Sequence, residues 1–246
     1  MELCEACKED RYPGLCLGSS GVGKTIAAHN YAKWRYFSHL TNPHFERIPV
    51  NDAEVLLSFD TVIYTPLISM SANAVLVQLL SLMGTFESII EKEAGLGSPS
   101  DGQVKLIIID EANRLKYQSL EHIRDLFDQL RIGVVFMGLH GFEKYISCLP
   151  QFRNRVGFRH EFKALPLAYM MGIVESEFFN TMGFGITNEI FDNRDTISRL
   201  VRATGGNMRI LNRLCLQIKR ILRIHNRDTI TPEVIEAARE ALIIGA

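Results

Sequence analysis

The chain has 246 residues, 47% of them hydrophobic and 22% charged, and its formal net charge is −1. This composition is ordinary for a globular protein and excludes a strongly basic chain, although a balanced total leaves room for a local basic face. The apolar runs are shorter than the roughly 20 residues of a membrane-spanning helix, and no signal-peptide pattern opens the chain. We therefore expect a cytoplasmic protein that has no membrane partner.

The cysteines point to reduced thiols, because there are five of them and no secretion signal accompanies them. Cys4 and Cys7 form a C-x-x-C pair within residues 1–13, a segment that we interpret as a short polar lead. A zinc site needs a second ligand pair, and a redox pair follows a strand. We expect neither a metal role nor a redox role for this pair.

Strands and helices are predicted to alternate after this lead. The expected strands are 15–17, 61–64, 106–109 and 132–137, and the expected helices run from the glycine-rich stretch to about 37, from 74 to 83 and from 117 to 130. Continuous aliphatic strands are typical of a parallel sheet that is buried on both faces. The alternation predicts an α/β fold in which right-handed crossovers place helices around a central parallel sheet.

Only helices are predicted beyond a hinge near Leu165-Pro166. They are expected at 168–181, 189–203, 208–224 and 232–242. Thr231 suits the N-cap of the last helix and Pro232 its first position. The sequence thus predicts an α/β domain at 1–166 and a small, all-helical lid domain at 167–246.

A glycine-rich stretch, GSSGVGKT at 18–25, follows the first strand and opens the first helix. It matches G-x-x-x-x-G-K-[ST], the phosphate-binding P-loop or Walker A motif. Its backbone N–H groups can cradle phosphates, its lysine brings a positive charge to the β- and γ-phosphates, and its threonine hydroxyl can ligate Mg²⁺. The expected nucleotide-binding residues are Gly18, Ser20, Gly21, Val22, Gly23, Lys24 and Thr25.

Asp110 and Glu111 end the most hydrophobic strand, at the edge where open α/β sheets bind their ligands. We expect Asp110 to hold Mg²⁺ together with Thr25, as a Walker B acid does. Glu111 is the expected general base for the attacking water. The alternative is a polar cap on the strand without a ligand.

Arginines supply the remaining candidates. Arg153, Arg155 and Arg159 precede and enter the last strand region, and a planar guanidinium suits the charge of a γ-phosphate in the transition state. We choose Arg155 as the residue that reaches a neighbouring subunit's nucleotide, with a solvated or DNA-facing basic loop as the alternative. Arg209, in the first turn of a lid helix, can fold back onto the phosphates. Most other basic residues of the lid are interpreted as a solvated face.

Together these residues resemble the AAA+ ATPases, and within them the TniB/TnsC/MuB-like regulators of DNA transposition, from about residue 13 to residue 238. The Walker motifs are shared by P-loop NTPases in general. Three further features are similar to TniB and TnsC proteins in particular. They are LIIIDEANRL at 106–115, GVVFMG at 133–138, and QFRNR at 151–155 followed by GGNMRILNRL at 205–214.

The resemblance implies a protein that binds ATP and Mg²⁺ and oligomerises as a ring or helical filament on double-stranded DNA. It further implies recruitment of a DDE transposase, in many elements with a TniQ-type target selector, and ATP hydrolysis that disassembles the oligomer. The implied roles are nucleotide binding by Lys24 and Thr25, hydrolysis by Asp110 and Glu111, an arginine finger at Arg155 and a second sensor at Arg209.

The chain departs from the family pattern at two places. The family usually has a threonine directly after the glycine that corresponds to Gly138, and this chain has Leu139 there. The lack of a hydrogen-bonding side chain at this position puts the rate of ATP hydrolysis in question. His140, the next residue, is either a sensor candidate or an ordinary loop residue. Lys92 is the only basic residue between 65 and 103, so DNA contacts there would use hydroxyls and backbone N–H groups.

Other functions compete with this interpretation. The main alternative is an AAA+ switch that remodels or loads a protein partner in secretion or replication. A P-loop kinase is disfavoured by Glu111 and by the helical lid with its Arg209, and a GTPase by the lack of an N/T-K-x-D motif.

Overall fold

The computed structural model describes residues 2–42, 44–50, 52–95, 102–175, 191 and 194–242, and only the backbone of Arg153. The chain divides into two compact units. The first comprises Met1–Gly18 and Lys24–Phe162, and the second comprises Ser19–Gly23 and Lys163–Ala246. The tip of the glycine-rich loop therefore belongs with the helical unit rather than with the sheet.

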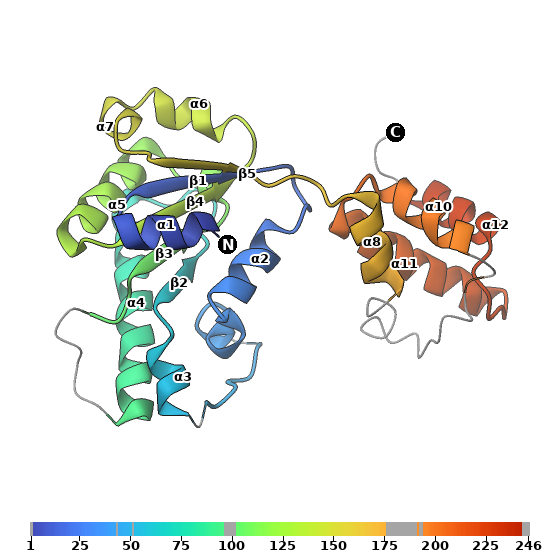
Figure 1. The fold of residues 1–246 in the computed structure, drawn as a ribbon, viewed down its shortest axis with the longest axis horizontal. Helices are drawn as coiled ribbons and strands as arrows, with labels where there is room; N and C mark the ends of the chain where they lie inside the picture. Colours follow the sequence, from blue (N-terminus) through green and yellow to red (C-terminus); the bar gives the residue numbers. More distant parts are fainter. Residues whose placement is uncertain are drawn as a thin grey trace. The chain divides into compact units, whose positions relative to one another are not determined.

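Five parallel strands form the centre of the first unit (Figure 1). They are β1 (Pro13–Leu17), β2 (Thr61–Tyr64), β3 (Leu106–Ile109), β4 (Gly133–Gly138) and β5 (Phe158–Glu161), in the order β2-β3-β4-β1-β5. Every residue of the first four strands is buried, as their aliphatic runs predict, whereas the edge strand β5 is largely exposed. The order brings the carboxyl ends of β1, β3 and β4 together at one edge.

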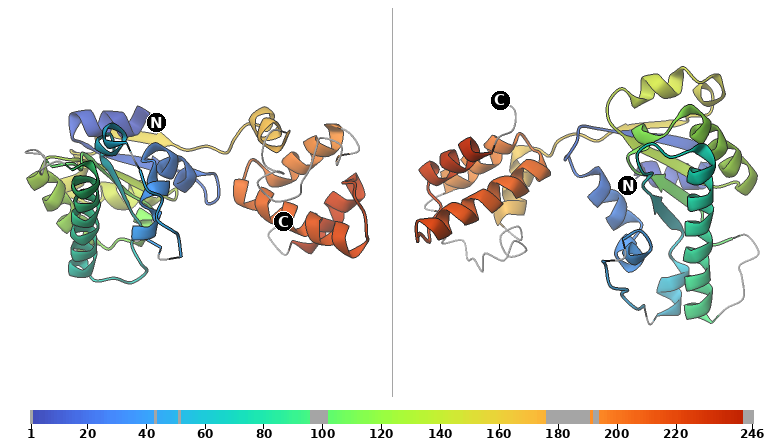
Figure 2. Two further views of the ribbon diagram at one scale, coloured as in Figure 1. Left: turned by 90° about the horizontal axis from the view of Figure 1, so that it is seen from below. Right: turned by 180° about the vertical axis from the view of Figure 1, so that it is seen from behind.

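Helices cover both faces of this sheet. Figures 1 and 2 show α1 (Glu2–Asp10) and α2 (Lys24–Tyr31) on one face, and α4 (Ala72–Ala94) and α5 (Tyr117–Leu130) on the other. Right-handed crossovers require this division, because the chain moves one way along the sheet through α2 and the opposite way through α4 and α5. The predicted α/β fold with a central parallel sheet is confirmed.

The first unit also contains shorter elements. They are η1 (Trp34–Tyr36), η2 (Ser38–Leu40), α3 (Ala53–Leu57), η3 (Ala112–Arg114), α6 (Phe142–Ser147) and α7 (Pro150–Arg153).

The predicted polar lead is wrong, because residues 2–10 form the helix α1, which packs on the sheet. Cys4 and Cys7 are its fully buried residues, and burial raises the pKa of each thiol to about 12. A Cβ built on Gly133 would lie 2.3 Å from the Cys7 carbonyl oxygen, so the helix and β4 meet at backbone contact. The composition was misleading because charged residues fill the exposed side of a helix whose two fully buried side chains are cysteines.

Two helix boundaries also differ from the prediction. α2 ends at Tyr31 rather than near residue 37, because Lys33 turns into the left-handed region with φ 49° and starts η1. The following Trp34 and Phe37 are buried against Phe86. α4 runs to residue 94 instead of 83 and ends at Gly95, whose φ is 67°.

By length and apolar composition alone, α4 is long enough to cross a membrane. Its buried residues Val75, Leu79, Met83, Phe86 and Ile90 recur every three to four positions, which is the stripe of a helix packed on one side. The helix contacts β2, α3 and α5. These contacts are those of a core helix in the first unit.

The second unit is built from helices around their own apolar core. They are α8 (Leu167–Ile173), α10 (Arg194–Thr204), α11 (Met208–Ile224) and α12 (Pro232–Ala241). The helices predicted at 208–224 and 232–242 are confirmed to within a residue. The predicted helix at 189–203 is wrong at Phe191, which pairs with Ile230 in an isolated bridge, and α10 begins at Arg194. The rest of this start and the end of the helix predicted at 168–181 fall in 176–190 and 192–193, which lie outside the described residues.

The contact between α1 and β4 yields a test of stability. Gly133→Ala should destabilise the protein by about 1–3 kcal/mol, because its methyl group would overlap the Cys7 carbonyl. Gly84→Ala is the matched control: nothing lies within 4 Å of its added Cβ in the middle of α4, and it should stabilise by about 0.5–1 kcal/mol. Urea unfolding compares the two, and equal midpoints would contradict the packing of α1.

Candidate nucleotide-binding site

The glycine-rich loop begins where β1 ends. The Gly18 N–H donates to the Gly138 carbonyl oxygen at 3.2 Å, which ties the start of the loop to the end of β4. A Cβ on Gly18 would lie 2.3 Å from the Phe162 carbonyl oxygen, so no larger residue fits without a backbone shift. The start of the loop is therefore held by the ends of two strands, β1 and β4.

The first unit brings Lys24, Thr25 and Asp110 to this edge. The Lys24 Nζ donates to the Gly18 carbonyl oxygen at 2.7 Å, so the ammonium group lies over the loop. The Thr25 Oγ1 donates to the Asp110 Oδ2 at 2.6 Å. Asp110 is buried at the end of β3, and the Glu111 N–H donates to its other oxygen, Oδ1, at 2.9 Å. Both carboxylate oxygens are thus held in place.

Glu111 follows in a left-handed turn with φ 53° and precedes η3. Residues other than glycine adopt this conformation rarely, and such turns concentrate at functional sites. Glu111 is half-buried, directly beside the carboxylate that contacts Thr25. The position suits a carboxylate that handles water rather than one that ligates a cation.

The pair of oxygens on Thr25 and Asp110 fits Mg²⁺. This cation prefers oxygen ligands and takes only one or two from a protein when phosphates and water supply the rest. The described residues contain no group of three or more His, Cys, Asp or Glu side chains arranged for a metal. Within that part of the chain, the Thr25–Asp110 pair is the arrangement suited to a divalent cation at the P-loop.

The second unit contributes contacts to the loop tip, which belongs to it. The Asn207 Nδ2 donates to the Ser20 carbonyl oxygen at 2.8 Å, and the Arg209 Nη1 donates to the Ser20 Oγ at 2.7 Å. The Met208 N–H donates to the Gly21 carbonyl oxygen at 3.0 Å. Gly21 has φ 81°, and an added Cβ would lie 2.3 Å from the Asn207 Oδ1. The predicted Arg209 therefore lies at the start of α11 beside the tip of the glycine-rich loop, within the second unit.

Asn113 is a candidate that the sequence analysis missed. The Leu139 N–H donates to the Asn113 Oδ1 at 3.3 Å, so η3 carries an amide to the end of β4. The same side chain keeps an NH₂ donor, which Leu139 lacks. Its place three residues after Asp110 was the available signal.

His29 on α2 was also missed by the sequence analysis. Burial lowers the pKa of its imidazole, and the negative charge of Asp110 opposes this shift.

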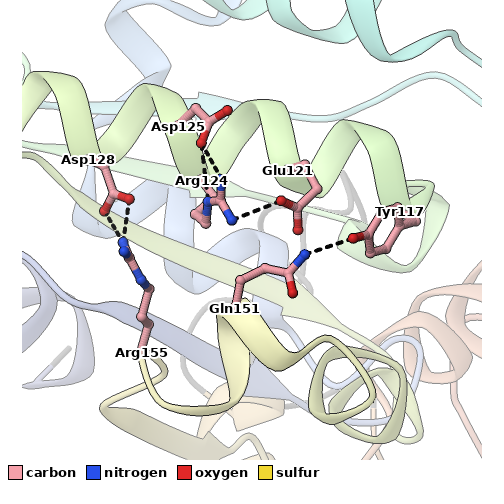
Figure 3. A network of polar contacts seen from close by, with 7 residues as sticks. All are labelled: Tyr117, Glu121, Arg124, Asp125, Asp128, Gln151 and Arg155. Carbon is pink, nitrogen blue, oxygen red and sulfur yellow. Dashed lines mark hydrogen bonds and ion pairs between the residues drawn. The ribbon is translucent and has the colours of Figure 1, made fainter.

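Arg155 lies elsewhere in the first unit. Figure 3 shows its guanidinium paired with both carboxylate oxygens of Asp128 on α5, in a charged network that also contains Arg124. Arg124 pairs with Glu121 at 2.8 Å and with Asp125. Among the residues that the structure describes, the side-chain partner of Arg155 is thus Asp128 rather than a Walker residue. Arg159 lies 4.0 Å from Glu143, and the side chain of Arg153 is outside the described part.

The sequence pattern of the AAA domain family matches residues 7–146, more than half of the chain. The chain belongs to the AAA domain family. A protein of Staphylococcus aureus named "potential ATP-binding protein" is 34% identical over 256 residues, which cover 99% of this chain and 93% of that protein. The predicted class of AAA+ ATP-binding protein is confirmed at this level.

Solved structures of AAA+ proteins share the fold of this AAA protein. The Thermotoga maritima RuvB Holliday junction branch migration motor has a TM-score of 0.61 at 16% identity, over 99% of this chain and 67% of RuvB. The ADP form of Aeropyrum pernix ORC2 has a TM-score of 0.61 at 15% identity, over 97% of this chain and 67% of the ORC2 chain. CDC6P of Pyrobaculum aerophilum has a TM-score of 0.64 at 14% identity, over 100% of this chain and 65% of the CDC6P chain. At these identities the likeness concerns the fold alone.

The place of Asn113 in this AAA protein yields a second prediction. If its amide contacts the γ-phosphate, Asn113→Ala should lower ATP turnover by about 100-fold and leave the dissociation constant for ATP nearly unchanged. Leu139→Ala is the control, because the leucine supplies only its backbone N–H to the contact. Phosphate release and nucleotide titration measure the two quantities. Equal turnover in both variants would exclude Asn113 as a sensor.

Proposed function

We propose that the chain is an ATP-dependent regulator of DNA transposition. It binds ATP and Mg²⁺, oligomerises on double-stranded target DNA, recruits a DDE transposase with a TniQ-type selector where one exists, and hydrolyses ATP to disassemble. The observation that carries its ATPase part is the hydrogen bond from Thr25 to Asp110 with Glu111 alongside. The resemblance of 106–115, 133–138, 151–155 and 205–214 to TniB and TnsC proteins supports the transposition part.

In this proposal each site residue has a distinct role in ATP binding or hydrolysis. Lys24 and the loop N–H groups bind the β- and γ-phosphates, and Thr25 and Asp110 hold the cation, which supplies charge neutralisation there when bound. Glu111 accepts the proton of the attacking water. Arg209, which contacts Ser20, orients the loop tip towards the phosphates.

Arg155 completes the site from a second copy of the chain. Its half-exposed guanidinium at the surface of the first unit supports this role, because Asp128 is an exchangeable partner of a surface ion pair. Hydrolysis would therefore be fast only in the assembled state. Regulation by assembly follows directly, since a single subunit lacks the finger for its own nucleotide.

One observation favours the alternative, an AAA+ switch that acts on a protein partner. Leu67 and Ile68 follow β2 and are 61% and 77% exposed. The Arg114 Nη1 donates to the Pro66 carbonyl oxygen at 3.1 Å, which anchors this loop next to η3. An exposed, anchored apolar loop suits contact with a polypeptide.

Two substitutions in the Walker motifs test the proposed function. Lys24→Ala should abolish ATP-dependent assembly on duplex DNA, because the γ-phosphate loses its counter-charge. Glu111→Gln should leave assembly intact and stop turnover, because the amide cannot accept a proton. Electron microscopy with duplex DNA and phosphate-release assays measure these outcomes. A wild-type protein that forms no oligomer on duplex DNA with ATP or a non-hydrolysable analogue would exclude the transposition proposal and leave the alternative.

The finger is tested at Arg155. Arg155→Ala should lower turnover of the DNA-bound oligomer on the order of 10³-fold and leave the turnover of dilute monomer unchanged. Arg124→Ala removes a neighbouring arginine of the same network and should have little effect. If the two variants lose the same activity, the network is structural and Arg155 is not the finger.

A further inference from the structure

The outer face of α11 carries charge of one sign only. The helix carries Arg209, Arg213, Lys219, Arg220 and Arg223 and no acidic residue. Its opposite face is apolar and fully packed into the core, with Leu211, Leu214, Cys215, Ile218 and Leu222 buried. The basic residues are therefore confined to the solvent side.

Three of these arginines lie on one exposed side of the helix and are called here the α11 row: Arg213, Arg220 and Arg223. All three are exposed, and their spacing of seven and three residues places them on one side of the helix. The row spans about 15 Å at 1.5 Å per residue. One strand of a DNA duplex presents a phosphate about every 3.4 Å along its axis, so the row covers several consecutive phosphates.

The α11 row differs from three other arginines of this unit, which pair with acids. Arg194 pairs with Glu175 at 3.4 Å, Arg199 with Asp195 at 2.8 Å and Arg239 with Glu236 at 3.3 Å. No ion pair within 4.0 Å joins the three arginines of the row to any of the described residues. Like charges on successive helical turns repel, so the row is unfavourable unless an anion neutralises it.

We propose that the α11 row binds the phosphate backbone of double-stranded DNA. The inference rests on the proposed function, which names the DNA partner without naming a surface. A polyanion fits better than a second copy of the chain, because the row has no acid interspersed and the chain as a whole is nearly neutral. Guanidinium groups also match phosphate geometry better than ammonium groups. Leu216, 53% exposed on the same side, would contact sugars.

The test compares two variants that remove the same charge from the same unit. One replaces Arg213, Arg220 and Arg223 by Gln, and the control replaces the paired arginines Arg194, Arg199 and Arg239 by Gln. Fluorescence anisotropy with a 30-base-pair duplex and a non-hydrolysable ATP analogue gives affinity across a salt series. The row variant should bind on the order of 10²-fold more weakly, and its salt slope should fall by about 2.7, as expected for three lost phosphate contacts. The control variant should retain most of the affinity for the duplex and most of the salt slope.

Each other outcome overturns the inference in a recognisable way. Equal losses in the two variants, with unchanged circular dichroism, would show a general charge effect. Loss of ATP-dependent assembly without DNA, in the row variant alone, would show that the row binds a second copy of the chain. Weaker binding to single-stranded DNA or duplex RNA but not to duplex DNA would show a different nucleic acid. If the wild-type protein binds no duplex at all, the proposed function fails together with the inference.

Discussion

The hydrogen bond between Thr25 and Asp110 is the contact on which the site depends. It joins the first turn of α2, which follows β1, to the residue after β3, and it forms because the strand order places only β4 between β1 and β3 and aligns their carboxyl ends. The burial of both strands fixes the two ends rigidly. The other oxygen of the same carboxylate accepts the Glu111 N–H, so Asp110 also fixes the backbone of the residue proposed as the general base.

The P-loop is divided between the two units. Gly18 and Lys24 belong to the first unit, whereas the tip between them contacts Asn207, Met208 and Arg209 of the second. α11 consequently has two distinct parts: its first turn contacts the tip of the glycine-rich loop, and its outer row has no ion pair with the residues that the structure describes. In the proposed function, one helix would thus respond to ATP at its start and to DNA along its length.

The sequence predicted the sheet and the Walker residues, because continuous aliphatic strands and a spaced glycine motif have few alternative structures. It failed for α1, a helix with many charged residues whose fully buried side chains are two cysteines. It missed Asn113, since a contact between η3 and the end of β4 depends on strand order rather than on local sequence. The row on α11 was interpreted as solvated because pairing with acids, which distinguishes it from Arg199 and Arg239, is visible only in three dimensions.

ATP binding measured with Mg²⁺ and with EDTA, for the wild-type protein and for Asp110→Asn, tests the central claim most directly. The account predicts that Mg²⁺ tightens ATP binding by the wild-type protein at least about tenfold, and that the substitution removes most of this difference, because an amide is a poor ligand for the cation. An equal dependence on Mg²⁺ in the two proteins would contradict the assignment of Thr25 and Asp110 as the cation site.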